Sequence, residues 1–267
     1  MNKLEAVIFD WAGTLVDFGS RAPMGAFVKA FAAFDVEITL DEARAPMGRG
    51  KRDHIAAVFA TPRVAAAWQA QHGKAPDDAA IDALYEVFLP LNTETAAHYS
   101  TPIPGAAKVL ADLRARGLKI GSTTGYTRSI MTRVLPVAAE GGVATDLLFC
   151  SDELCAGRPH AAGMFANMLK LEIANAAHVV KVDDTPVGIE EGRNAGAWTV
   201  GLTLSGNETG LSEAELDALS AEERSTARDR ATARFTAVGA HFVIDTINDL
   251  PAVLAEIEDR LAAGQRP

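Results

Sequence analysis

The stretch LEAVIFDWAGT, residues 4–14, ends a short apolar run on an aspartate, followed by a glycine that permits a tight turn. Similar apolar runs recur along the chain at spacings that leave room for a helix between them. The predicted strands cover residues 4–9, 118–122, 147–150, 178–182, 198–202 and 241–244. Strands that alternate with helices predict an α/β fold with a doubly wound, Rossmann-like parallel sheet. In such a sheet ligands bind beyond the carboxyl ends of the strands.

Helical patterns fill the intervals between these runs. The predicted core helices cover residues 106–116, 128–139, 160–171, 189–195 and 247–261. The interval between the first two strands is longer, and it holds only helical patterns, at 25–33, 55–60, 63–72 and 78–88. An insertion of this size at the active end of a sheet is typical of a cap, and Pro102 and Pro104 mark its return hinge. We therefore predict a core of residues 1–19 and 101–267 and a helical cap of residues 20–100; the charged stretch 207–237 has no functional interpretation.

The composition describes a soluble globular protein. The chain has 267 residues, 48% hydrophobic and 22% charged, and 25 basic against 35 acidic residues give a formal charge of −10. This balance argues against a broad nucleic-acid or anionic-membrane surface, so we expect a small-molecule partner. Neither a targeting segment nor a run of about 18 apolar residues is visible. Together with Cys150 and Cys155, which we expect to be reduced, these features favour the cytoplasm.

Carboxylates follow two of the predicted strands. Asp10 comes directly after the first run, and Asp183 and Asp184 follow the run at 178–182. Each of them can simply cap the next turn, but adjacent acids at the end of a buried strand repel each other. They persist most readily when a cation such as Mg²⁺ lies between them and Asp10.

Phosphate-binding side chains follow two further runs. Residues 121–126, GSTTGY, offer hydroxyls and backbone N–H groups near a helix start, where phosphate oxygens bind. Arg158 follows the run at 147–150 and can neutralise an oxyanion. A plain capping role is available for each signal alone, but four signals in order at four strand ends are hard to explain that way.

This ordered set resembles the haloacid dehalogenase superfamily, and the resemblance covers the full chain. It implies that Asp10 is the nucleophile and that Thr124 and Arg158 bind the phosphoryl group. It also implies that Asp184 is a Mg²⁺ ligand and that Asp183 binds the metal directly or through water.

One departure from the superfamily narrows the function. Most of its phosphatases carry a second aspartate two residues after the nucleophile, and here Ala12 holds that place. A general acid typically accelerates such a reaction by about 10²- to 10⁴-fold. Without one at this position, we expect the chain to be a poor catalyst of phosphate-ester hydrolysis. Either the site is crippled, or its leaving group needs no acid there.

Residues of the predicted cap favour the second alternative, a leaving group that needs no acid at position 12. Met47, Lys51 and His54 share one face if their segment is helical. The neighbouring Arg49 and Arg52, together with burial, would lower the pKa of Lys51 toward neutrality, as a Schiff-base amine requires. A solvated basic helix explains the same residues without chemistry.

The tetrapeptide DWAG at 10–13, Met47-Gly48 with Lys51, and TTGY at 123–126 resemble the phosphonoacetaldehyde hydrolases, the phosphonatase branch of the superfamily. In that family a cap lysine forms an imine with the aldehyde, the aspartate takes the phosphoryl group, and acetaldehyde and phosphate are released. The resemblance implies a homodimer paired through the caps. It also implies roles for the following residues: Lys51 as the imine amine, Met47, His54 and Tyr126 in support of it, Gly48 and Gly125 against the substrate, and the Ala12 carbonyl on Mg²⁺.

Two alternatives stay open at this point. The first is a phosphomonoesterase or phosphomutase of the same superfamily, and the second is a degenerate phosphate-binding protein. A further departure concerns the metal, since a second acid is common four residues after Asp184, where this chain has Gly188. Asp183 is the candidate substitute.

Overall fold

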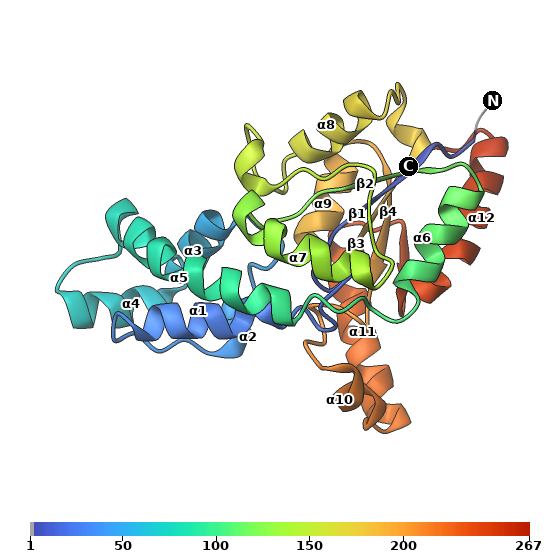
Figure 1. The fold of residues 1–267 in the computed structure, drawn as a ribbon. Helices are drawn as coiled ribbons and strands as arrows, with labels where there is room; N and C mark the ends of the chain where they lie inside the picture. The colour runs from blue at the N-terminus through green and yellow to red at the C-terminus, as the bar shows by residue number, and fades with distance from the viewer. Residues whose placement is uncertain (1–2) are drawn as a thin grey trace.

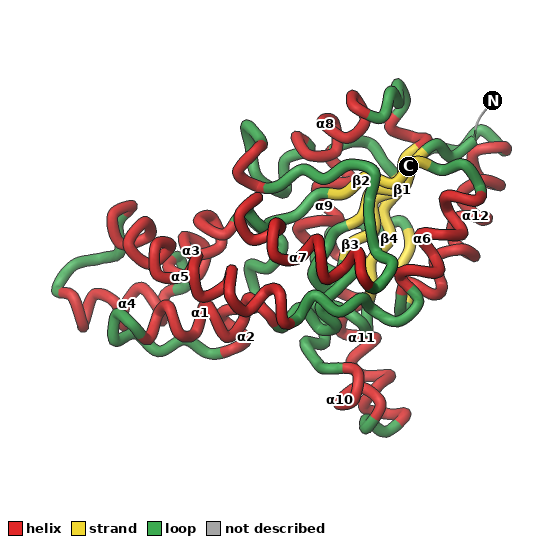
Figure 2. The backbone as a smooth tube through the Cα atoms, viewed as in Figure 1, coloured by secondary structure: helices red, strands yellow, loops and turns green. Residues whose placement is uncertain are grey.

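The computed structural model describes residues 3–267 and contains one parallel sheet of five strands in the order β2-β1-β3-β4-β5 (Figures 1 and 2). The strands are β1 (Ala6–Phe9), β2 (Lys119–Ser122), β3 (Val179–Asp183), β4 (Trp198–Leu202) and β5 (Phe242–Ile244). The predicted doubly wound parallel sheet is therefore confirmed. Successive strands leave β1 first toward β2 and then toward β3, so the crevice where the order reverses lies at the end of β1.

The strand predicted at 147–150 is wrong. Phe149 N donates to Ser122 O at 3.1 Å, and Thr124 N donates to Phe149 O at 3.2 Å. The segment thus runs beside the end of β2 but makes only an isolated bridge between Thr123 and Phe149. Its apolar side chains pack against the core without extending the sheet.

Helices cover both faces of the sheet. One apolar cluster joins the sheet to α6 (Ala106–Ala115), α7 (Arg128–Glu140) and α12 (Leu250–Ala262). On the other face lie α8 (Ala162–Lys170), α9 (Pro186–Asn194) and α11 (Ala221–Ala237). Short 3₁₀ turns are present at Ser151–Glu153, Ala176–His178 and Ile247–Asp249.

The long insertion after β1 forms a separate helical layer, at the left of Figure 1. Its helices are α1 (Ala22–Ala32), α2 (Leu40–Arg44), α3 (Lys51–Phe59), α4 (Pro62–His72) and α5 (Asp78–His98). They enclose their own apolar cluster, which includes Phe27, Phe31 and Phe88. This arrangement is the helical cap that the sequence predicts; the boundaries at residues 20 and 100 stay a prediction.

Two features of the cap differ from the expectation. The sequence predicts no helix at α2, and it ends the last cap helix at Phe88, whereas α5 continues through Pro90 to His98. Helix α5 packs against α1 and the core helix α7, and this packing, which buries Ala96, outweighs the hydrogen bond lost at the proline.

The charged stretch 207–237 folds as a loop followed by α10 (Glu213–Asp217) and α11, which extend from the lower side of the core in Figure 1. Within residues 3–267, none of the helices combines the length and the apolar character needed to cross a bilayer.

Candidate active site

Three carboxylates meet at the ends of β1 and β3. Asp10 follows β1 directly, Asp183 is the last residue of β3, and Asp184 comes next. Because β1 and β3 are parallel neighbours, with Phe9 paired to Val182, their carboxyl ends lie side by side. One oxygen from each carboxylate lies within 4.8 Å of the others, and all three side chains are buried. The structure therefore brings together the acids that the sequence places at separate strand ends.

Burial and mutual repulsion disfavour full ionisation of this cluster. Burial, then repulsion by Asp183, raises the pKa of Asp10 to about 6, although Arg158 opposes the shift. The pKa of Asp184 is raised for the same two reasons, burial first and then the charges of Asp10 and Asp183. Burial also acts on Asp183, but the cations Lys181 and Arg158 outweigh it and lower its pKa.

Arg158 pairs directly with the carboxylate of Asp10. Its Nη1 donates to Asp10 Oδ1 at 2.8 Å, and its Nη2 donates to the backbone oxygen of Thr123 at 2.7 Å. The guanidinium also lies 2.9 Å from Glu191 and 3.4 Å from Asp183. Burial alone would lower the pKa of Arg158, but these carboxylates raise it, so the side chain stays charged. Arg158 thus holds Asp10 in place.

A buried network beneath these residues was not predicted from the sequence. Lys181, fully buried on β3, lies 3.1 Å from Asp183 and 3.2 Å from Glu191. Its Nζ donates to Thr123 Oγ1 at 2.8 Å, and that hydroxyl donates to Glu191 Oε2 at 2.8 Å. A lysine inside the run VVKVD, residues 179–183, was the signal available, because an unpaired cation in a buried strand is costly. Glu191 carries no comparable signal.

The charge balance of this site calls for a cation. Carboxylate oxygens are hard donors that suit Mg²⁺, and oxygens this close repel each other unless a cation lies among them. Buried carboxylates outnumber buried cations by one: Asp10, Asp183, Asp184 and Glu191 against Arg158, Lys181 and the cap residue Lys51. The described residues therefore fit a divalent metal ion.

The Asp183 carboxylate occupies the space that a side chain at Gly188 would fill. A Cβ at this position would lie 1.9 Å from Asp183 Oδ2, so any side chain there would displace the carboxylate. Asp183 Oδ1 is held in turn by the backbone N of Thr185, at 3.0 Å, and by its hydroxyl, at 2.7 Å. The absence of an acid at Gly188 and the presence of Asp183 are therefore linked sterically.

Lys51 is the first residue of α3 and is only 4% exposed. Its Nζ lies 4.8 Å from the ring centroid of Tyr126, 5.7 Å from that of Phe27 and 4.0 Å from Met47 Sδ. Among the residues that the structure describes, Lys51 forms no salt bridge. Burial lowers its pKa to about 8, against the opposing attraction of Asp10.

The sequence predicted this shift and its main cause, burial, but it named the wrong neighbouring cations. Arg52 pairs with Asp78 and Asp82 on the outside of the cap. The nearby cation that lowers the pKa of Lys51 is Arg158 of the core. Met47 does not share a helix with Lys51 either. The backbone at Gly48 has a φ of 95°, which is not helical, and α3 begins only at Lys51. A turn rather than a helix face brings Met47 to the amine.

Cap and core enclose one small cavity of about 20 Å³. Asp10, from the core, and Lys51, from the cap, both line it. The other lining residues are Ala12, Ser20, Pro23, Met47, Gly48, Thr124, Gly125, Tyr126 and Thr185. The volume suits about one water molecule, so this conformation leaves no room for a larger ligand.

Tyr126 and Thr124 lie on the core side of this cavity. The Tyr126 side chain is 3% exposed, and its hydroxyl has no hydrogen-bond partner among the described residues. Burial, followed by nearby carboxylates, raises the pKa of Tyr126 well above its usual range, so the phenol stays protonated. Thr124 Oγ1 accepts from Tyr126 N at 3.1 Å.

His54 lies behind the cavity and does not line it. Its Nε2 is 2.7 Å from Ala43 O, and because a carbonyl only accepts, Nε2 carries the proton. The ring stacks on Phe27 at 3.9 Å between centroids, and burial, with Lys51 nearby, holds its pKa well below the usual range. The Nδ1 of neutral His54 is therefore an acceptor, and it has no hydrogen-bond partner within residues 3–267.

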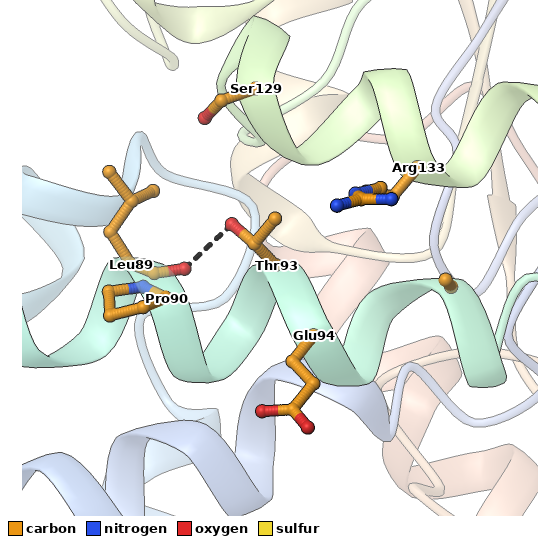
Figure 3. A pocket seen from close by; sticks show the side chains of 7 residues that line it. Leu89, Pro90, Thr93, Glu94, Ser129 and Arg133 are labelled. Atoms are coloured by element: carbon orange, nitrogen blue, oxygen red, sulfur yellow. Dashed lines mark hydrogen bonds between the residues drawn. The ribbon is translucent and has the colours of Figure 1, made fainter.

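A larger hollow of about 600 Å³ lies elsewhere, between α5 and α7 (Figure 3). Figure 3 shows Thr93 of α5 on the side toward Ser129 and Arg133 of α7, whereas the Glu94 carboxylate points away from them. The Thr93 hydroxyl donates to Leu89 O at 2.7 Å. None of the clustered carboxylates reaches it, so the small enclosed cavity is the candidate site.

A capped parallel α/β core with an aspartate after its first strand and a buried acidic cluster beside it defines a class of metal-assisted hydrolases. The family model of the haloacid dehalogenase-like hydrolases matches residues 4–196. Phosphonoacetaldehyde hydrolase of Paraburkholderia xenovorans is 51% identical over 267 residues, 100% of both chains. That of Bordetella pertussis is 53% identical over 265 residues, 99% of this chain and 96% of the relative. The chain belongs to the phosphonoacetaldehyde hydrolase family of haloacid dehalogenase-like hydrolases.

A solved structure agrees with this assignment. The phosphonoacetaldehyde hydrolase-like protein from Oleispira antarctica superposes with a TM-score of 0.97 at 41% identity and covers 99% of this chain and 96% of its own. The protein is therefore a hydrolase, and the resemblance noted from its sequence is confirmed.

Proposed function

We propose that the protein hydrolyses the phosphorus–carbon bond of phosphonoacetaldehyde to acetaldehyde and phosphate. The observation that carries this proposal is the shared cavity of Lys51 and Asp10. An amine that is buried, free of any carboxylate partner and lowered in pKa to about 8 suits imine formation. Ala12 fits the same chemistry, because a carbon leaving group offers no oxygen for an acid to protonate.

The first step joins the substrate to the cap. The neutral amine of Lys51 attacks the aldehyde carbon, and the resulting carbinolamine loses water to give a protonated imine. Lys51 Nζ lies over the ring of Tyr126, whose phenol keeps its proton, and we assign that phenol the role of donating to the departing hydroxyl. We assign His54 a supporting role, because its neutral Nδ1 accepts but cannot donate.

The second step breaks the phosphorus–carbon bond. A carboxylate oxygen of Asp10 attacks phosphorus, and the electron pair of that bond moves into the imine to form an enamine on Lys51. The iminium is the electron sink, so no free carbanion forms. Arg158 and Thr124 bind the phosphoryl oxygens, while Arg158 keeps Asp10 aimed along the line of attack.

The third step returns the enzyme to its initial state. The enamine takes a proton on carbon and becomes an imine of acetaldehyde, which water hydrolyses to acetaldehyde and free Lys51. A second water cleaves the aspartyl phosphate on Asp10 and releases inorganic phosphate. One water is lost on imine formation and two are consumed later, so the sum is the hydrolysis of one bond.

Asp10, Asp184 and the Ala12 carbonyl would hold Mg²⁺, with Asp183 binding directly or through water. The bound ion supplies positive charge that screens the carboxylates from the phosphoryl oxygens and neutralises charge on those oxygens. Gly48 and Gly125 line the cavity without side chains, and we assign them contact with the substrate through their backbones.

We further propose a cytoplasmic homodimer with a core of residues 1–19 and 101–267 and a cap of residues 20–100. The dimer rests on the resemblance to relatives that pair through their caps. Free Cys150 and Cys155 support a reducing compartment.

The test is acetaldehyde release from phosphonoacetaldehyde, followed with alcohol dehydrogenase and NADH, with Mg²⁺ and with EDTA. Turnover is expected only with the metal. Lys51→Arg keeps the charge but cannot form an imine, so it should abolish turnover, whereas Lys29→Arg, an exposed change on α1, should not. Retained activity in Lys51→Arg, or preferential turnover of phosphate monoesters, would favour an ordinary phosphatase.

A further inference from the structure

Arg44, the last residue of α2, reaches from the cap to the core. Its Nη1 donates to Asn207 O at 2.9 Å, and it also lies 3.3 Å from Asn207 Oδ1 and 3.2 Å from Gly19 O. Asn207 is 1% exposed and belongs to the loop after β4, whereas Gly19 lies in the segment that leads into the cap. One guanidinium nitrogen thus joins the cap, its connecting segment and the core.

The loop that receives Arg44 also holds a proposed metal ligand. The backbone N of Asn207 donates to Asp184 Oδ2 at 2.7 Å. Two consecutive hydrogen bonds, from Arg44 to Asn207 and from Asn207 to Asp184, therefore connect the cap to the acidic cluster. Thr14 holds the other oxygen of Asp184 at 3.2 Å, so the orientation of this carboxylate depends on both partners.

Helix α11 supports the same loop from the other side. Arg234 pairs with the buried Glu208 at 2.9 Å, and Arg230 donates to Glu208 O at 3.1 Å. Gly210 makes room for the cap side chain, since a Cβ there would lie 2.2 Å from Arg44 Cζ. The charged stretch 207–237, which lies beyond the matched residues 4–196, thus forms the core side of a contact with the cap.

We propose that Arg44 is a positioning residue that couples closure of the cap to the orientation of Asp184 through Asn207. The inference rests on the proposed function for its effect on turnover, but not for the contact itself. When the cap opens, Arg44 leaves Asn207 O, and the loop loses the contact that presses its amide toward Asp184. The metal site is then fully ordered only while Lys51 covers Asp10.

Hydrogen exchange tests the coupling without substrate or metal. In the metal-free full chain, Arg44→Met should speed amide exchange about tenfold or more both in the cap segment 45–55 and in the loop 205–210. Arg63→Met is the matched control, because Arg63 pairs with Glu42 inside the cap, and it should leave loop 205–210 unchanged. Arg44→Gln, which is shorter but still polar, repeats the test if Arg44→Met does not fold.

Kinetics supply the second measurement. Arg44→Met should lower kcat/KM about 10- to 100-fold and raise the Mg²⁺ concentration needed for half-maximal rate, whereas Arg63→Met should change neither. Unchanged exchange in the loop 205–210, or an equal effect of Arg63→Met, would overturn the coupling. A wild-type protein without acetaldehyde release would refute the proposed function but leave the exchange result standing, so the two failures are distinguishable.

Discussion

Replacing Met47 by glutamate tests whether burial without a paired carboxylate sets the pKa of Lys51. Met47 Sδ lies 4.0 Å from Lys51 Nζ, so a carboxylate at this position would lie within ion-pair reach. A carboxylate within about 4–6 Å favours the ammonium form and raises its pKa by roughly 1–3 units. Starting from a pKa of about 8, the shift would lower the fraction of neutral amine at neutral pH about tenfold or more.

The assay is the pH dependence of kcat/KM for acetaldehyde release, with Met47→Gln as the isosteric neutral control. Because imine formation needs the unprotonated amine, the rate should rise with pH and level off near the pKa of Lys51. We expect the midpoint of this rise near pH 8 in the wild type and in Met47→Gln, and at least about one pH unit higher in Met47→Glu. At neutral pH Met47→Glu should therefore be about tenfold or more slower than Met47→Gln.

The same midpoint of kcat/KM against pH in Met47→Glu and Met47→Gln would refute this account of Lys51. A wild-type midpoint near the ordinary lysine pKa of 10.5 would also refute it, because the pKa of the buried amine would then not be shifted.

Further predictions concern the buried network and the metal site. Lys181→Met leaves Glu191 without one of its two cations, so it should lower the free energy of unfolding by about 3–5 kcal/mol, measured by urea denaturation; a loss below about 1 kcal/mol would show that the network is dispensable. Gly188→Ala should displace Asp183 and weaken Mg²⁺ binding in calorimetry, whereas Gly25→Ala, which meets open space on α1, should not; equal affinities would contradict the steric link.

The sheet and the acidic cluster could be predicted because each depends on local pattern plus one rule of topology. An apolar run followed by Asp10, and another followed by Asp183, needs only the parallel sheet to bring the acids together. The same logic failed at residues 147–150, because an apolar run can pack against a core without joining its hydrogen-bond ladder.

Features that depend on distant segments had no local signal. The contact of Arg44 with Asn207 joins positions 163 residues apart, and neither residue stands out within its own segment. The position of His54 outside the cavity is similar, since it follows from where α3 begins and from the bond to Ala43 O rather than from helical spacing. Lys181 is the exception, because a charge inside an apolar strand is visible in the sequence itself.

The most direct test of the central claim is reductive trapping. Borohydride added to the protein during turnover of phosphonoacetaldehyde with Mg²⁺ should reduce the imine to a stable secondary amine. Peptide mass spectrometry is expected to find that adduct on Lys51 and to find none when substrate is omitted. Turnover without any adduct on Lys51, or an adduct confined to another lysine, would contradict the account.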